Sequence, residues 1–127
     1  PTQELIDTLK PDLVIDCMQK TEPRTRDYWL PIQAEKITFP FADAHVLPDL
    51  SQLAAVTRRI ITGMQNGERV LVHCAAGLNR SGLVTALTLV KMGVDPAQAI
   101  FALRKLRHPN VLGNVMFDTY VRSWRAT

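Results

Sequence analysis

The stretch Val70-Leu-Val-His-Cys-Ala-Ala-Gly-Leu-Asn-Arg-Ser-Gly82 determines the fold expected of this chain and also carries its chemistry. The short apolar run Val70–Val72 predicts a buried strand. A turn that contains glycine follows, and the next apolar pattern predicts a helix from about Arg80 to Lys91, which Gly93 ends. A buried strand that turns directly into a helix is typical of an α/β protein.

The turn between this strand and this helix is suited to binding an anion. A helix N-terminus presents unpaired N–H groups and the positive end of the helix dipole. The turn begins with small side chains that let backbone amides approach a phosphate closely, and an arginine at the start of the helix can hold two phosphate oxygens. The residues expected to bind phosphate are Ala75, Ala76, Gly77, Leu78, Asn79 and Arg80.

Cys74 lies at the bottom of this turn, where the positive field favours the thiolate form of a cysteine. A thiolate beside a bound phosphate can attack phosphorus. Ser81 is close enough in sequence to give its hydroxyl to the sulfur when the sulfur becomes the leaving group. A buried structural cysteine is the alternative interpretation. The strand, cysteine, glycine turn, arginine and helix follow one another in working order, which favours catalysis.

The rest of the chain predicts strands that alternate with helices. The expected elements are a helix over Thr2–Lys10, a strand over Leu13–Cys17, a surface loop from Lys20 to Glu35, a strand over Lys36–Phe39, a helix capped by Asp49 or Ser51 that reaches Gln65, a helix from Asp95 to about Arg107, and a last helix from about Val115 to Arg125. Alternation of this kind indicates an α/β sandwich with a mostly parallel sheet.

Length and composition set broad limits. A chain of 127 residues with 46% hydrophobic residues predicts one packed domain over residues 1–127. A net charge of +3 is compatible with an anionic substrate but does not require nucleic acid or membrane. No apolar run is long enough to span a membrane. Two cysteines are too few for a disulfide scaffold, so we expect a reducing, cytoplasmic location. We also expect a monomer.

The spacing around Cys74 matches a known family. Cys74, five further residues and then Arg80-Ser81 form the Cys-x5-Arg-Ser/Thr pattern, and the stretch from His73 to Gly82 matches its stricter form. From about Leu13 to Trp124 the chain resembles the protein tyrosine and dual-specificity phosphatase superfamily, in particular its compact members. The resemblance implies a three-layer sandwich, a cysteinyl-phosphate intermediate, and no metal or cofactor. It also implies that His73 orders the loop and keeps the nucleophile ionised.

A thiolate nucleophile needs a proton donor for the departing oxygen, and a carboxylic acid on a mobile loop is the usual solution. The segment from Phe39 to His45 resembles the general-acid loop of compact dual-specificity and phosphoinositide phosphatases. We therefore predict that Asp43 is the general acid and then the base. A turn-forming role for Asp43 is the alternative. Asp49 is the rival acid, but its place before an apolar helical stripe makes it a better N-cap.

Three further residues are candidates for the site. His45 could touch substrate or tune Asp43, or could be an exposed loop side chain. Asn114 resembles the asparagine that a late loop contributes near the active site, with Asn110 as its rival and a helix N-cap as an equal explanation. Cys17 resembles a cysteine that forms a reversible disulfide with the nucleophile in phosphoinositide phosphatases, and a buried apolar role is its alternative.

The loop and its surroundings also bear on the substrate. A protein that carries phosphotyrosine is the favoured substrate, with phosphoserine and phosphothreonine as further options. The absence of lysine from the loop argues against a polyphosphorylated inositol. The end of the loop also resembles RNA 5′-triphosphatases, but those usually have Thr-His where this chain has Ala75-Ala76, so nucleic acid is disfavoured. Four loop residues could grip a substrate or pack down: Arg24, Arg26, Tyr28 and Trp29.

Two other classes of protein are open alternatives. A phosphate-recognition module without turnover would have no use for the acid Asp43. A thiol used in redox or arsenate chemistry would call for resolving cysteines near the loop, and only Cys17 is available.

Overall fold

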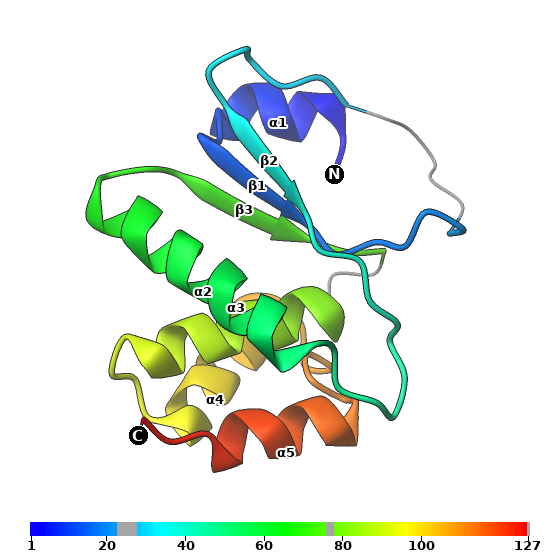
Figure 1. Cartoon of the computed structure of the whole chain (residues 1–127), viewed down its shortest axis with the longest axis vertical. Helices are drawn as coiled ribbons and strands as arrows, with labels where there is room; N and C mark the ends of the chain where they lie inside the picture. The colour runs from blue at the N-terminus through cyan, green and yellow to red at the C-terminus, as the bar shows by residue number, and fades with distance from the viewer. Residues whose placement is uncertain (23–27, 76–77, 127) are drawn as a thin grey trace.

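The computed structural model describes residues 1–22, 28–75 and 78–126 (Figure 1). In these ranges the elements are α1 (Gln3–Leu9), β1 (Leu13–Asp16), β2 (Glu35–Thr38), α2 (Leu50–Gln65), β3 (Val70–His73), α3 (Arg80–Lys91), α4 (Pro96–Leu106) and α5 (Val115–Ser123). All predicted elements are present. The boundaries differ by one or two residues, so that Cys17 and Phe39 lie just beyond their strands and α5 ends before Arg125.

The three described strands form one parallel sheet in the order β2-β1-β3. The central strand β1 is buried along its whole length, which explains its continuous apolar character. Asp16 at its end pairs with Thr38 of β2 and with His73 of β3. Because the strands are parallel, their carboxyl ends meet at one edge of the sheet, and the residues after each strand come together there.

The helices cover both faces of the sheet, which confirms the predicted α/β sandwich. Figure 1 shows α1 on one side and α2, α3, α4 and α5 on the other. The helix α3 is the centre of the larger layer, since it packs against α2, α4, α5 and the strand β3. The largest fully buried side chains that form this core include Leu13, Ile15, Leu53, Leu83, Leu87, Ile100 and Phe117.

The predicted helix caps agree with the structure. Asp49 accepts a hydrogen bond from the Gln52 N–H at 2.9 Å, so this carboxylate caps α2, as its sequence position suggested. Asp95 caps α4 in the same way. Within the described ranges, no helix is both long and apolar enough to cross a membrane.

Candidate active site

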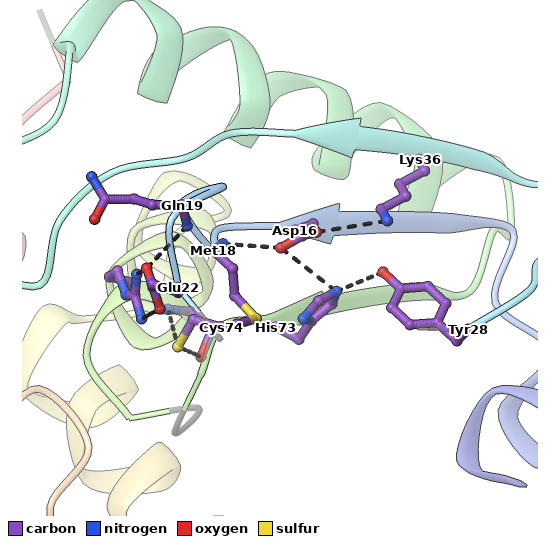
Figure 2. A network of polar contacts seen from close by, with 10 residues as sticks. Asp16, Met18, Gln19, Glu22, Tyr28, Lys36, His73 and Cys74 are labelled. Atoms are coloured by element: carbon purple, nitrogen blue, oxygen red, sulfur yellow. Dashed lines mark hydrogen bonds and ion pairs between the residues drawn. The ribbon is translucent and has the colours of Figure 1, made fainter. Parts of the chain in front are cut away.

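The strand β3 delivers Cys74 to the start of α3. The Cys74 sulfur lies 3.4 Å from the Ser81 hydroxyl oxygen and accepts from the Ser81 N–H at 3.5 Å (Figure 2). The cysteine is 9% exposed and the serine is buried. The first turn of α3 therefore places both the backbone and the side chain of Ser81 on the sulfur. Ala76 and Gly77, expected to line the phosphate site, lie outside the described residues.

The guanidinium of Arg80 is held by a carboxylate that the sequence did not single out. Nη2 donates to Oε2 of Glu22 at 2.9 Å, Nη1 donates to Oε1 of the same side chain, and Nη1 also donates to the Phe41 carbonyl at 3.3 Å. These hydrogen bonds to Glu22 raise the pKa of Arg80, although burial acts against them. Glu22 is fixed in turn because it accepts from the Gln19 N–H at 3.0 Å.

The predicted acid Asp43 is gripped by two asparagine side chains. Asn79 Nδ2 donates to Oδ2 of Asp43, and Asn114 Nδ2 donates to Oδ1, both at 2.9 Å. Asn114 also donates to the Ala44 carbonyl at 2.9 Å, and its backbone N–H donates to Oδ1 of Asn79 at 3.0 Å. We call Asp43, Asn79 and Asn114 the carboxylate clamp.

Asn114 has both of the roles that its sequence position allowed. Its side-chain oxygen accepts from the N–H groups of Met116 and Phe117 and so caps α5, while its amide nitrogen reaches Asp43. The rival Asn110 is exposed on the same loop. A single residue, Asn114, therefore both caps α5 and contacts the predicted acid.

The loop that carries Asn114 is fastened to Leu78, just before α3, and to Arg104 of α4. The Leu112 N–H donates to the Leu78 carbonyl at 3.0 Å, and Arg104 donates to the carbonyls of Val111 and Leu112 at 2.9 and 3.3 Å. A Cβ at Gly82 would lie 3.2 Å from the Val111 side chain. The glycine therefore allows this loop to approach α3 closely.

His73, at the end of β3, takes part in a polar network at the carboxyl edge of the sheet (Figure 2). The Tyr28 hydroxyl lies 2.7 Å from Nε2 of His73, and Oδ1 of the buried Asp16 lies 4.0 Å from the same nitrogen. Lys36 Nζ lies 3.6 Å from Oδ2 of Asp16 and 4.7 Å from the centroid of the Tyr28 ring. Tyr28, expected either to grip substrate or to pack down, lies against His73.

The remaining candidates make none of the contacts described above within the described part of the chain. Cys17 is fully buried, and its N–H donates to the His73 carbonyl at 2.9 Å, which sets it beside the chain that leads into Cys74. Burial raises the pKa of the Cys17 thiol, and the nearby Cys74 and Asp16 raise it further. Its disulfide role stays a prediction. His45 is exposed, as is the ring of Trp29, and Arg24 and Arg26 lie outside the described residues.

Sequence reasoning missed Glu22 and underestimated Tyr28. Both belong to the polar region between β1 and β2, which has no period and no motif. The sequence signal for them is that a carboxylate and an aromatic residue follow a strand whose carboxyl end meets the predicted phosphate loop.

Comparison with known proteins defines the class. Residues 2–127 match the family described as dual specificity phosphatase, catalytic domain, and the chain belongs to this family. A putative tyrosine phosphatase, 197R of Invertebrate iridescent virus 6, is 30% identical over 128 residues, which cover 95% of this chain and 48% of the viral protein. Human cyclin-dependent kinase inhibitor 3 is 32% identical over 88 residues, 68% of this chain and 41% of that protein. The chain thus spans less than half the length of these two relatives.

Solved structures agree on the fold. Tk-PTP in its active form superposes with a TM-score of 0.76 at 22% identity, over 98% of this chain and 88% of that one. Kinase associated phosphatase, in a form whose catalytic site cysteine is replaced by serine, gives a TM-score of 0.77 at 22% identity, over 94% and 71% of the two chains. The phosphatase-like fold expected from the sequence is therefore confirmed.

Proposed function

We propose that this chain is the catalytic domain of a metal-independent phosphatase that hydrolyses phosphate monoesters through a cysteinyl-phosphate on Cys74. The observation that carries the proposal is the sulfur of Cys74 at the N-terminus of α3, with the hydroxyl oxygen and the N–H of Ser81 at 3.4 and 3.5 Å. Membership of the dual specificity phosphatase family supports it. So does the relative with the same fold, which is described as having a catalytic site cysteine.

In the first step the Cys74 thiolate attacks phosphorus, a P–S bond forms and the P–O bond to the leaving group breaks. Asp43 gives its proton to the departing oxygen. The guanidinium of Arg80 has five N–H donors. Within the described part of the chain, Glu22 and Phe41 take three of them. The Nε–H and one Nη2–H remain, and these two form the side-on fork that would bind two phosphate oxygens.

In the second step a water molecule attacks phosphorus and the P–S bond breaks. Asp43, now ionised, takes a proton from the water and is ready for another cycle. The Ser81 hydroxyl donates a hydrogen bond to the sulfur as negative charge returns to it, which stabilises the leaving thiolate. Orthophosphate then dissociates.

The proposed substrate is a protein that carries phosphotyrosine. The viral relative is named a putative tyrosine phosphatase, which supports this choice. The phosphate loop contains no lysine that could hold a second phosphate, which disfavours a polyphosphorylated inositol. A tyrosine phosphopeptide is therefore expected to be turned over faster than a threonine phosphopeptide, a phosphoinositide or an RNA 5′-triphosphate.

The test is hydrolysis of p-nitrophenyl phosphate in EDTA by wild type, Cys74→Ser and Asp43→Asn. Wild type should turn over, Cys74→Ser should lose activity entirely, and Asp43→Asn should be slowed by about 10²–10⁴-fold, the usual contribution of general acid–base catalysis. Asp49→Asn is the matched control, because asparagine also caps a helix and Asp49 lies outside the site. If wild type, Cys74→Ser and Asp43→Asn are all inert yet bind a phosphopeptide, the chain is a recognition module.

A further inference from the structure

The carboxylate clamp joins three segments that are distant in sequence. Asp43 comes from the loop after β2, Asn79 directly precedes Arg80, and Asn114 caps α5. Each oxygen of Asp43 accepts one amide N–H at 2.9 Å. The two asparagines are also bonded to each other, since the Asn114 backbone N–H donates to the Asn79 side-chain oxygen. The acid is thereby tied both to the phosphate loop and to α5.

The side chain of Asn79 does not cap α3, although asparagine at this position normally does. Asn79 occupies the N-cap position of α3, where an asparagine oxygen usually accepts from the backbone of the first turn. Here its side chain makes no capping hydrogen bond and reaches outward to Asp43 and Asn114. A good capping residue that does not cap is evidence that its side chain serves another purpose.

Asp43 depends on such support because its own loop holds it weakly. Residues 42–46 are exposed and belong to no helix or strand. An exposed carboxylate on such a loop would rotate freely, whereas a proton donor must lie within hydrogen-bonding reach of one particular oxygen. Two amides on the two oxygens fix both the position and the plane of the carboxylate.

We propose that Asn79 is a positioning residue that ties the Asp43 carboxylate to the phosphate loop, so that proton donor and nucleophile keep one geometry, with Asn114 completing the clamp. The inference rests on the proposed function, in which Asp43 protonates the leaving oxygen. The position of the Asp43 carboxylate sets how fast the enzyme hydrolyses substrates with poor leaving groups, because those substrates alone need the proton. Phenolic esters such as phosphotyrosine belong to this class.

The test compares kcat/KM for phenyl phosphate, whose leaving group needs a proton, with kcat/KM for 2,4-dinitrophenyl phosphate, whose leaving group does not. Asn79→Ala should lower the value for phenyl phosphate by about tenfold to a hundredfold more than the value for dinitrophenyl phosphate, which is part of the full acid contribution. In an Asp43→Asn background, the same substitution should no longer distinguish the two esters, because the group it positions is already absent.

Further variants separate the clamp from folding. Asn79→Ser keeps a small polar side chain and should show the same pattern if Asn79→Ala folds poorly. Asn114→Asp keeps an oxygen to cap α5 but loses the amide donor and adds a like charge beside Asp43, so it should give the same leaving-group dependence. Asn110→Ala, on the exposed part of the same loop, is the control and should match wild type on both substrates.

Equal losses on the two esters, or an undiminished loss in the Asp43→Asn background, would show that Asn79 acts on loop structure or phosphate binding and would overturn the inference. Unchanged rates in Asn79→Ala would overturn it as well. Failure of the proposed function looks different, because wild type would then hydrolyse neither ester, and the inference would fall with it.

Discussion

Glu22 lies end-on against Arg80, with one carboxylate oxygen on each terminal nitrogen of the guanidinium. The arginine is 7% exposed, so the pair is largely shielded from water. This end-on contact leaves the side-on edge of the guanidinium, with its Nε–H and one Nη2–H, for the proposed phosphate. We therefore propose that Glu22 orients Arg80 and does not compete with substrate.

Glu22→Gln is expected to lower kcat/KM about tenfold and to weaken binding of inorganic phosphate. A glutamine has one side-chain oxygen in place of two, so the buried guanidinium loses one of its two hydrogen-bond acceptors on this side chain. Its orientation is then no longer fixed. Loss of a hydrogen bond to a charged group should also reduce the free energy of unfolding by about 1.5–3 kcal/mol. Phosphate inhibition and denaturant unfolding measure the two effects.

Glu35→Gln is the matched control for Glu22→Gln, since Glu35 pairs with Arg59 on the surface at 2.9 Å, far from the site. It should leave phosphate binding unchanged. Tighter phosphate binding by Glu22→Gln would mean that the carboxylate blocks the phosphate site, and the end-on interpretation would then be wrong.

Tyr28→Phe is expected to reduce kcat severalfold with little change in KM. The tyrosine hydroxyl lies 2.7 Å from Nε2 of His73, the residue directly before the nucleophile, so its removal should loosen the histidine ring. The free energy of unfolding should fall by about 0.5–1.5 kcal/mol, as for one neutral hydrogen bond. Tyr120→Phe on α5 serves as control. A rate identical to wild type would show that Tyr28 does not support the loop.

Cys17 is expected to resist alkylation in the folded protein. Burial raises the pKa of its thiol, so the reactive thiolate is scarce near neutral pH. Iodoacetamide should therefore modify Cys74 first, as read by peptide mass spectrometry.

The same thiol should make the stability of the protein depend on pH. Because the unfolded chain ionises Cys17 at lower pH than the folded chain, the contribution of Cys17 to the free energy of unfolding should be lost as pH rises above about 9. Cys17→Ala should flatten that alkaline decline, and an unchanged decline would contradict it.

Arg104→Lys is expected to lower activity through the loop that carries Asn114. Lysine keeps the charge but cannot reproduce the fork that holds the carbonyls of Val111 and Leu112. Activity on phenyl phosphate should fall severalfold and the melting temperature should drop. Arg122→Lys is the control, since the Arg122 guanidinium donates to Asp118 of its own helix and, among the described residues, holds no carbonyl of this loop. A melting shift without any loss of activity would limit Arg104 to a structural role.

The order of elements could be predicted from the sequence because its signals are local. A buried β-run followed by a glycine turn and an apolar helical stripe specifies β3 and α3 within a few residues. The caps Asp49, Asp95 and Asn114 were recognisable because a cap satisfies N–H groups two or three residues away. The nucleophile, its arginine and its serine also lie within one short segment.

The partners of these residues could not be predicted in the same way. Glu22 is 58 residues from Arg80, Tyr28 is 45 from His73, and Asn114 is 71 from Asp43. No periodicity connects such positions. Asn79 was expected to line the phosphate site, and the direction of its side chain toward Asp43 depends on where α5 begins in space.

By itself, the sequence determined a parallel α/β domain with a cysteine and an arginine around the start of a helix that is expected to bind phosphate, since burial and backbone hydrogen bonding act over a few residues. Only the tertiary structure decided which carboxylate holds Arg80 and which amides hold Asp43. The parallel order β2-β1-β3 brings the carboxyl ends of the strands to one edge, and the packing of α5 against α3 adds Asn114. Contacts of that kind arise from strand order and helix packing, which no local pattern of residues records.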